Sequence, residues 1–315
     1  MSPVHLGGGQ AAPEVDVLNT PMQAISIIKK DREFYKNLGV LVEALKGIAI
    51  SQFQALEKKI VSFEEFMRIL DGFFDPLDLI SIQHPFVDPH DAPSGIVAVT
   101  SDAGLLGGLN HRVMTAAVGN MKDPRSKLIV IGLQGQKIAQ GYKIPCKTFT
   151  GITDENRYLM AMEIRDYVVN EVLDRHIGTV KVIHPVAISL KIQQVGELNL
   201  LPFLEWKKSA SSAVSKEIAD QSRPAEPYGS DILLETLPSD LIEYLTIVGL
   251  GQKFFDILQL SRLAELAART IHLEESSQKV KEIDKKLQLQ YFRARHEIID
   301  QQMRELFTAR SLYTS

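Results

Sequence analysis

The densest group of residues that could do chemistry lies between Gly95 and Arg112, in the stretch GIVAVTSDAGLLGGLNHR. A short apolar run rich in β-branched residues is followed by a serine, an aspartate and a glycine-rich turn, and then by a helical pattern. Backbone N–H groups at the beginning of a helix attract anions, so a turn of this kind could cradle a phosphate. A turn that only connects a buried strand to a helix would use the same residue types.

The glycine spacing favours a structural turn or a subunit contact. The glycines fit neither the dinucleotide fingerprint G-x-G-x-x-G nor a P-loop, and the turn has no lysine. Asp102 has no second carboxylate or histidine at a catalytic spacing, so we expect it to cap the turn that follows it and to do no acid–base work. The residues assigned to the turn are Ser101, Asp102, Gly104, Gly107, Gly108 and Asn110. A ligand cradle stays open as the alternative.

Two further groups of reactive residue types carry no site. His84, Asp88, His90 and Asp91 cluster in HPFVDPHDAP, but the prolines there favour an exposed extended linker and no H-x-x-x-H pair supports a metal centre. We therefore expect His84 and His90 on the surface. Cys146 is expected to be a small buried hydrophobe. The sequence predicts no catalytic residue, no cofactor and no metal.

Composition narrows the functional classes. The chain of 315 residues has a net charge of −4, which offers no electrostatic basis for binding nucleic acid. A single cysteine excludes a disulfide framework and indicates a reducing compartment. No window approaches 18 consecutive apolar residues, so we expect membrane association only through a partner. Residues 1–20 do not read as a signal or transit peptide and are expected to form a flexible tail.

Both ends of the chain are helical in pattern. Between Met22 and about Ile60 there is no proline, and apolar residues recur at steps of three and four on one helical face: Leu38, Leu41, Leu45 and Ile48. From Pro238 to Ser315 there is again no internal proline. Apolar residues there repeat at coiled-coil spacing: Leu273, Val280, Leu287 and Ala294, with Tyr291 and Ile298 as the offset set.

This C-terminal seam has interruptions. The offset positions before Tyr291 are Ser277 and Asp284, which are polar, and Gly249 and Gly251 are candidates for a break or a bend. Periodicity alone would also suit an ordinary helix of a bundle. The length of the segment without a capping signal favours an extended helix.

The middle of the chain alternates between strand and helix patterns. Strand-like runs occupy Ile96–Val99, Leu128–Ile131 and Val180–Ile192, and helical patterns occupy Asn110–Met121 and Glu155–His176. This alternation predicts an α/β domain with a mainly parallel sheet. Lys207–Gly229, rich in Ser, Ala and Pro, is expected to be a mobile loop.

The segment from Ser101 to Asn110 resembles the signature of the gamma subunit of F-type ATP synthases, which reads serine, aspartate, a variable or basic residue, glycine, leucine, then C-G-G-L-N. The segment from Leu287 to Leu306, LQLQYFRARHEIIDQQMREL, resembles the C-terminal helix of that family. The chain departs from the family at Leu106, which replaces the cysteine, and at Leu45, which replaces a methionine.

The resemblance implies a fold and a set of contacts. The fold would be a long antiparallel coiled coil of the two terminal helices with a central Rossmann-like α/β domain. Its divisions would be a tail at 1–20, helices at 21–70 and 231–315, and the α/β domain at 71–230. Arg295 matches the arginine that contacts a catalytic β subunit in the family, whereas His296 and Asp300 stand where glutamine and threonine are usual. An aspartate facing an acidic partner loop would repel it.

The resemblance also implies a function. The chain would be the central-stalk rotor of an ATP synthase, carrying torque between the membrane c-ring and the α3β3 hexamer, and would have no catalytic activity of its own. Its partners would be the α, β and epsilon subunits and the c-ring, at the cytoplasmic face of a bacterial inner membrane. Two alternatives stay open: the rotor of a hydrolysis-only paralogue, suggested by His296 and Asp300, and an α/β enzyme that binds a small molecule at the glycine turn.

Overall fold

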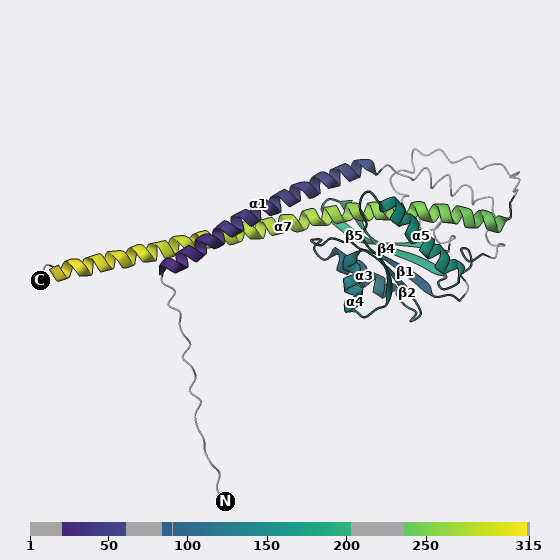
Figure 1. The fold of residues 1–315 in the computed structure, drawn as a ribbon, viewed down its shortest axis with the longest axis horizontal. Coiled ribbons are helices and arrows are strands. Elements are labelled where there is room, and N and C mark those ends of the chain that lie inside the picture. The colour runs from purple at the N-terminus through teal and green to yellow at the C-terminus, as the bar shows by residue number, and fades with distance from the viewer. Residues whose placement is uncertain (1–20, 61–83, 90, 203–235, 314–315) are drawn as a thin grey trace, which may run out of the picture. The chain divides into compact units, whose positions relative to one another are not determined.

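The computed structural model describes residues 21–60, 84–89, 91–202 and 236–313 (Figure 1). The expected tail at 1–20 and the expected loop at Lys207–Gly229 lie outside these residues. In chain order the elements are α1 (Pro21–Lys59), β1 (Ser94–Val99), α3 (Leu109–Asn120), β2 (Lys127–Ile131), α4 (Leu133–Gly141), β3 (Cys146–Phe149), α5 (Arg157–Leu173), β4 (Thr179–Ser189), β5 (Ile192–Leu201) and α7 (Pro238–Tyr313).

The chain divides into two compact units. The helical unit contains α1 as far as Glu43 and α7 from Ser276 onward, and the α/β unit contains residues 44–275. Both divisions fall inside a helix. The reason is that the N-terminal part of α7, which includes Leu250 and Phe254, belongs to the hydrophobic core of the α/β unit.

The α/β unit contains one five-stranded sheet with the order β3-β2-β1-β4-β5. The first four strands are parallel, and β5 joins the edge of β4 as an antiparallel hairpin partner. Strand β1 lies in the centre of the sheet, and crossover connections lead to the parallel strands on either side of it. This is the open, Rossmann-like arrangement. The prediction of a mainly parallel sheet is therefore confirmed.

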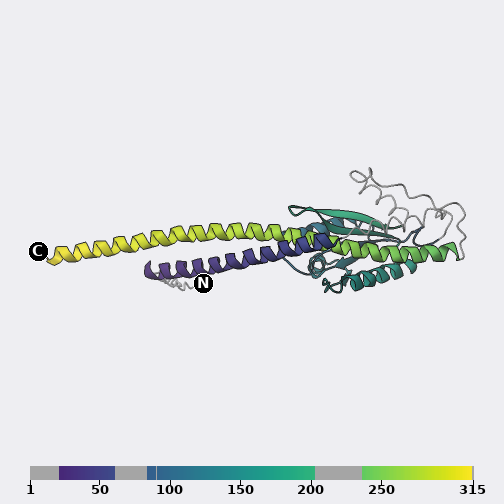
Figure 2. The same ribbon diagram turned by 90° about the horizontal axis from the view of Figure 1, so that it is seen from above.

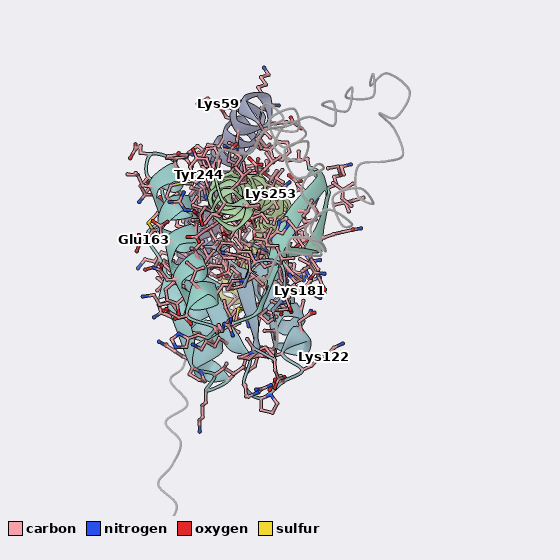
Figure 3. All side chains as sticks on the ribbon, turned by 90° about the vertical axis from the view of Figure 1, so that its right-hand side faces the viewer. Lys59, Lys122, Glu163, Lys181, Tyr244 and Lys253 are labelled. Carbon is pink, nitrogen blue, oxygen red and sulfur yellow. The ribbon has the colours of Figure 1, made fainter. Side chains whose placement is uncertain are left out.

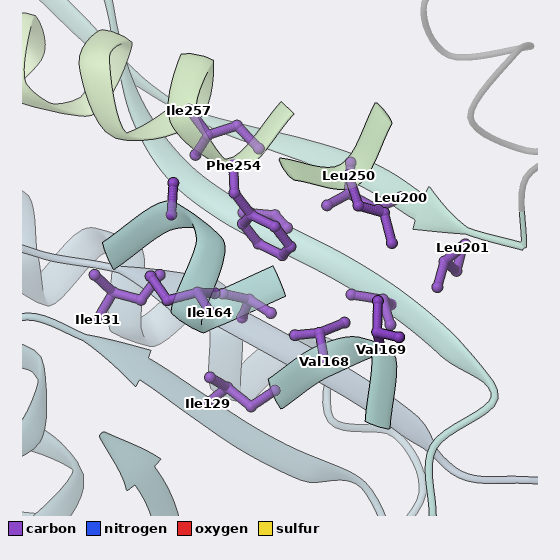
Figure 4. Close-up of a cluster of buried hydrophobic side chains, with 14 of the residues drawn as sticks. Ile129, Ile131, Ile164, Val168, Val169, Leu200, Leu201, Leu250, Phe254 and Ile257 are labelled. Atoms are coloured by element: carbon purple, nitrogen blue, oxygen red, sulfur yellow. The ribbon is translucent and has the colours of Figure 1, made fainter. Parts of the chain in front are cut away.

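Helices cover both faces of the sheet (Figure 1). On one face, alternate residues of β1 and β2 pack with α3 through residues such as Val113 and Met114. On the other face, the intervening strand residues pack with α5 and α7 around Ile164, Phe254 and Ile257 (Figure 4). Central strands buried on both faces have to be apolar throughout, which explains the continuous apolar runs of β1 and β2.

The outer surface of this unit is charged and polar. Side chains such as Lys122 and Glu163 are exposed and point away from the sheet (Figure 3). The same helices have apolar faces toward the sheet; in α5, for example, the buried Ile164 follows the exposed Glu163. This amphipathic pattern is expected of helices packed on a sheet.

Both terminal segments form helices, as predicted, and α1 ends at Lys59. Residues 61–70 and 231–235 of the predicted helices lie outside the described residues. α1 has 39 residues and begins at Pro21, where a first-turn proline costs no hydrogen bond, and α7 has 76 residues and begins at Pro238. Gly249 and Gly251, the candidates for a break or a bend, do not interrupt α7. A Cβ at Gly251 would lie 2.9 Å from Cε of Met162, so this glycine allows α7 to approach α5 closely.

Within the helical unit, α1 and α7 run antiparallel to each other (Figures 1 and 2). Arg32 pairs with Asp284, and Glu43 contacts Ser277 and Lys281, so residue numbers rise along one helix as they fall along the other. The predicted seam of α7 faces inward, since Leu273 and Val280 are buried and Leu287 is half-buried. The apolar face predicted for α1 is wrong, because Leu41, Leu45 and Ile48 are exposed, whereas Val42 and Ala49 are buried. The predicted antiparallel pairing of the terminal helices is confirmed.

Three elements differ from the sequence prediction. The run Val180–Ile192 is not one strand, because β4 ends at Ser189 and β5 begins at Ile192 after a tight turn. Helix α4 and strand β3 were not predicted. Both are short, at nine and four residues, and too little of either is apolar for a period to be visible.

Candidate functional site

The glycine-rich turn after β1 is closed by its own side chains. The backbone N–H of Ser101 donates to Oδ1 of Asn110 at 3.2 Å, and Nδ2 of Asn110 donates back to Oγ of Ser101 at 2.9 Å. The Ser101 hydroxyl donates in turn to the backbone carbonyl of Ala103 at 2.6 Å. The polar groups of Ser101 and Asn110 therefore hold the turn on the first residues of α3.

Asp102 has a different position from the one expected. Its carboxylate does not cap the turn that follows it. Instead Oδ1 accepts from the N–H of Leu133 at 2.8 Å, and Oδ2 accepts from the N–H groups of Gly151 and Ile152, both at 2.9 Å. Leu133 begins α4, and Gly151 follows β3. One carboxylate thus ties together the carboxyl ends of three parallel strands, which meet at the same edge of the sheet.

Two of the three glycines in the turn have a conformational role. Gly107 and Gly108 have φ values of 56° and 86°, in the left-handed region that other residues avoid, and Gly108 is the N-cap of α3. A Cβ at Gly104 would meet nothing within 4 Å. Leu105 also has a positive φ, of 66°, and its side chain is 53% exposed. Backbone strain at an exposed residue of this kind occurs more often at functional sites than elsewhere.

The turn packs against the C-terminal helix. Leu106, which stands where the family has cysteine, forms a small buried cluster with Leu109 and Ala268 of α7. An open hollow of about 690 Å³ adjoins this contact. Its lining includes Lys137 and His272, together with glycines of the turn. The hollow therefore offers cationic and apolar groups, but its lining holds no carboxylate that could serve as a general base.

A buried ionic group lies on the same side of α7 and was missed by sequence reasoning. Glu265 is buried, and its carboxylate accepts a hydrogen bond from Arg262 at 3.0 Å. Burial raises the pKa of Glu265, the charges of Arg262 and Arg269 act against that rise, and the charge of Asp102 adds to it. Arg262 also approaches Asp154, in the loop before α5, at 3.7 Å. In the sequence, the only sign of this buried group is that Glu265 stands among the apolar residues of α7.

The three predicted contact residues belong to the helical unit. Arg295, His296 and Asp300 lie on α7 and are exposed. His296 and Asp300 are four residues apart and share a face of the helix, whereas Arg295 lies about 100° around it. The glycine-rich turn belongs to the α/β unit. The predicted residues therefore form two separate sets, one in each unit.

The same part of α7 exposes an unusual number of large apolar side chains. Their exposed fractions run from 43% for Ile299 to 67% for Leu306, and the set is Leu289, Phe292, Ile299, Met303, Leu306 and Phe307. Soluble monomers seldom expose contiguous apolar surface of this extent, and such surfaces mark sites of protein association. These residues lie outside the inward-facing seam that the sequence predicts.

The other residues that the sequence offered as candidates are two histidines and a cysteine. His84 is not a surface residue, because its side chain is only 9% exposed and its Nε2 lies 3.4 Å from a carboxylate oxygen of Glu243. His90 lies outside the described residues. Cys146 is half-buried against the core beside α3, and burial raises the pKa of its thiol. Among the described residues no group of His, Cys, Asp and Glu could hold a metal ion, and no helix is apolar and long enough to span a membrane.

Solved structures place this architecture in a class of proteins. The rotor of the mitochondrial ATP synthase of Euglena gracilis matches with a TM-score of 0.61, at 16% identity, over 88% of this chain and 99% of its own. One chain of a solved structure of the central stalk and c-ring of the Tetrahymena thermophila mitochondrial ATP synthase matches with a TM-score of 0.51, at 17% identity, over 75% of this chain and 99% of its own. The chain therefore has the fold of a central-stalk protein of rotary ATP synthases.

Sequence comparison gives the family. A family model described as ATP synthase matches residues 25–311, so the chain belongs to the ATP synthase family. Its relatives include the ATP synthase gamma chain of Nostoc punctiforme, 22% identical over 90% of this chain and 98% of the relative. The gamma chain of Mycoplasmopsis pulmonis is 25% identical over 86% of this chain and 92% of the relative. The resemblance stated from the sequence is confirmed.

Proposed function

We propose that this chain is the gamma subunit of a rotary ATP synthase or ATPase and acts as its central rotor. The observation that carries the proposal is the match of a single family model to residues 25–311, because that range includes both terminal helices as well as the α/β unit. The gamma-chain relatives are matched over nearly their whole length, which supports the same role for the whole chain.

The proposed mechanism uses shape and surface more than side-chain chemistry. The exposed apolar residues of α7, such as Phe292 and Leu306, together with Arg295, provide a face that could contact the inner surface of an α3β3 hexamer. A rotor selects among conformations of the catalytic subunits only if it interacts differently with each of them. The asymmetric distribution of charge and apolar surface around α7 would supply that difference.

ATP chemistry would belong to the catalytic subunits of the complex and not to this chain. The sequence has no P-loop of the form G-x-x-x-x-G-K-[ST], and Asp102, the most acid-base-like residue of the turn, is occupied by three backbone N–H groups. The functional division we propose follows the predicted boundaries, with a shaft at 21–70 and 231–315 and an α/β domain at 71–230 that would contact the epsilon subunit and the c-ring.

The proposed location is the cytoplasmic face of a bacterial inner membrane, as a peripheral part of the complex. The bacterial sources of the gamma-chain relatives support this location. Attachment would be through the c-ring, since no described helix is long and apolar enough to span a membrane.

A hydrolysis-only paralogue is the second candidate, and it is favoured by two residues. His296 and Asp300 replace the family's glutamine and threonine, and both are exposed on α7 where they could meet a partner. An aspartate at this position would repel an acidic loop of a β subunit. ATP synthesis by inverted membrane vesicles that contain the complex would exclude this alternative.

The direct test is reconstitution with the matching α and β subunits. The three chains are co-expressed, the complex is isolated through an affinity tag on β, and ATPase activity is measured with and without this chain. We expect one copy of this chain per hexamer and turnover that depends on its presence. A chain that fails to join the hexamer and instead forms a compact ligand-binding dimer would overturn the proposal.

A further inference from the structure

The seam between α1 and α7 in the helical unit contains two polar contacts where an apolar coiled coil would have none. We propose that these contacts, Glu43 with Ser277 and Lys281, and Arg32 with Asp284, set the register of α1 against α7. Glu43 and Arg32 are thus positioning residues that act through α7. The consequence for torque rests on the proposed rotor function, whereas the register itself does not.

The first polar contact is built around a buried hydroxyl. Ser277 is fully buried, and its Oγ donates a hydrogen bond to Oε1 of Glu43 at 2.6 Å. Nζ of Lys281, one turn further along α7, donates to the same oxygen at 3.0 Å. A buried hydroxyl without a partner is costly, so α1 is held most favourably where it presents Glu43 to this site.

The second contact lies about three helical turns away along α1. Nε of Arg32 donates to Oδ1 of Asp284 at 3.2 Å, and about a third of each side chain is exposed, at 32% and 33%. A partly exposed ion pair of this kind adds little to stability. The pair instead contributes to the choice of register, because a charge at a seam position strongly favours an oppositely charged partner over a mismatched one.

Gly39 lies between the two contacts and faces Val280 of α7. An added Cβ at Gly39 would lie 3.4 Å from Cγ1 of Val280, which is an ordinary van der Waals contact at short helix separation. Apolar packing at this point does not by itself select one register, since Leu273 and Leu287 lie one heptad to either side of Val280 and could take its place.

The polar residues of α7 penalise both of those neighbouring registers. A shift of one heptad in one direction would place Glu43 opposite Asp284, and Arg32 opposite Tyr291. A shift in the other direction would place Glu43 opposite Thr270 and Glu274. Either shift therefore confronts Glu43 with a carboxylate and separates Arg32 from Asp284, which is how coiled coils exclude wrong pairings.

Holding the register has a consequence for a rotor. Torque carried by two paired helices tends to slide one helix along the other, and apolar seams with a seven-residue repeat resist such a slide only until the next equivalent position. Polar contacts that are satisfied in one register alone would keep α1 in place under load.

Disulfide cross-linking of the full chain reads the register directly. In a Cys146→Ser background, the native register is reported by Gly39→Cys with Val280→Cys. The two shifted registers are reported by Gly39→Cys with Leu287→Cys or with Leu273→Cys. We expect the parent chain to cross-link the native pair and neither shifted pair, because a disulfide requires Cβ atoms about 4 Å apart.

The polar contacts are then removed by four changes: Glu43→Leu, Ser277→Ala, Arg32→Leu and Asp284→Leu. We expect cross-linking of at least one shifted pair to rise by about fivefold or more, since contacts further along the two helices, such as Lys46 with Glu274 at 2.8 Å, are then the polar contacts left to favour the native register. Exclusive cross-linking of the native pair in this variant, with helix content kept by circular dichroism, would overturn the proposal.

Charge exchange separates register selection from a loss of folding. Arg32→Asp alone faces Asp284 with a like charge and should increase cross-linking of a shifted pair. Adding Asp284→Arg should restore the native pair, and Glu43→Gln, which keeps an acceptor for Ser277, should retain it. A failure of the exchange to rescue the native pair would contradict selection by charge. Because these assays use the isolated chain, their outcome is distinct from that of the hexamer reconstitution.

Discussion

Leu106, in the glycine-rich turn, packs directly against Ala268 of α7, so a local motif in the α/β unit is anchored on the C-terminal helix. Leu106 is 5% exposed, and Ala268, also 5% exposed, lies about 160 residues further along the chain. The turn therefore has a stabilising contact that its own hydrogen bonds do not provide.

Truncation of this leucine tests the contact. Leu106→Ala should lower the free energy of unfolding by about 2–3 kcal/mol, because it removes buried methyl groups and leaves a cavity. Leu105→Ala, at the adjacent and exposed residue, is the matched control and should change it by less than about 0.5 kcal/mol. Urea unfolding followed by circular dichroism measures both. Equal effects of the two substitutions would show that the contact is unimportant.

The carboxylate of Asp102 is expected to be a principal stabiliser of the sheet edge. Asp102→Ala removes the acceptor of three backbone N–H groups, at Leu133, Gly151 and Ile152, and should cost about 2–3 kcal/mol of unfolding free energy. Faster hydrogen exchange should appear at those three amides. Glu163→Ala, which removes an exposed carboxylate, serves as the control; a similar loss for this variant would argue against the bonding role.

Two glycines of α4 provide a paired test of close packing. A Cβ at Gly135 would lie 2.4 Å from Oγ1 of Thr100 and 2.6 Å from Cγ1 of Val130, so Gly135→Ala should destabilise the chain by about 1–3 kcal/mol. A Cβ at Gly141 would meet nothing within 4 Å. Gly141→Ala should instead be neutral or stabilise by up to about 1 kcal/mol. Thermal unfolding of the two variants decides the point.

His184 makes stability depend on pH. Burial lowers its pKa from 6.5 to about 4, so the native state keeps this imidazole neutral. Between these values the unfolded chain binds the extra proton, and stability falls as the pH drops from about 6.5 to about 4. The loss should approach about 3 kcal/mol.

The contribution of His184 is isolated by subtraction. Glu265 acts in the opposite direction, because burial raises the pKa of its carboxyl group and its protonation therefore favours the folded state at lower pH. The difference between the pH profiles of the parent chain and of His184→Gln removes that background. A difference that does not change between pH 7 and pH 4 would show that His184 does not titrate as described.

The proposed rotor–stator contact predicts a functional effect without a structural one. Arg295→Ala should leave the thermal unfolding of the isolated chain unchanged, since the side chain is exposed. In the reconstituted complex it should lower chain-dependent ATPase turnover roughly 3- to 10-fold, the effect of losing one charged contact. Arg293→Ala, also exposed on α7, is the matched control. An identical effect of both substitutions would point to general charge and not to a specific contact.

Much of the architecture could be read from the sequence because its signals are local. The period of apolar residues and the positions of Pro21 and Pro238 predicted α1 and α7, and the β-branched run beginning at Ile96 predicted β1. The short elements α4 and β3 could not be predicted, because they depend on their neighbours in the sheet and carry little pattern of their own.

The candidate residues also differ in whether their partners are close or distant in the sequence. Ser101 and Asn110 are nine positions apart and bond to each other within the glycine-rich turn, so the segment that the sequence singled out contains both partners. Asp102 bonds to residues 31 and 50 positions further along the chain, so only the folded sheet could identify its partners. For the same reason His84 was wrongly expected on the surface, since its burial depends on α7.

By itself the sequence determined the two terminal helices, the strand and helix on either side of the glycine turn, and the family to which the chain belongs, because periodicity, proline positions and the glycine turn act through neighbouring residues. The tertiary structure alone decided which polar groups are buried and paired, including Glu265 with Arg262, and Glu43 with Ser277. These pairings depend on the order of the strands and on the register of two helices distant in the chain. Both are properties of packing, which no local pattern encodes.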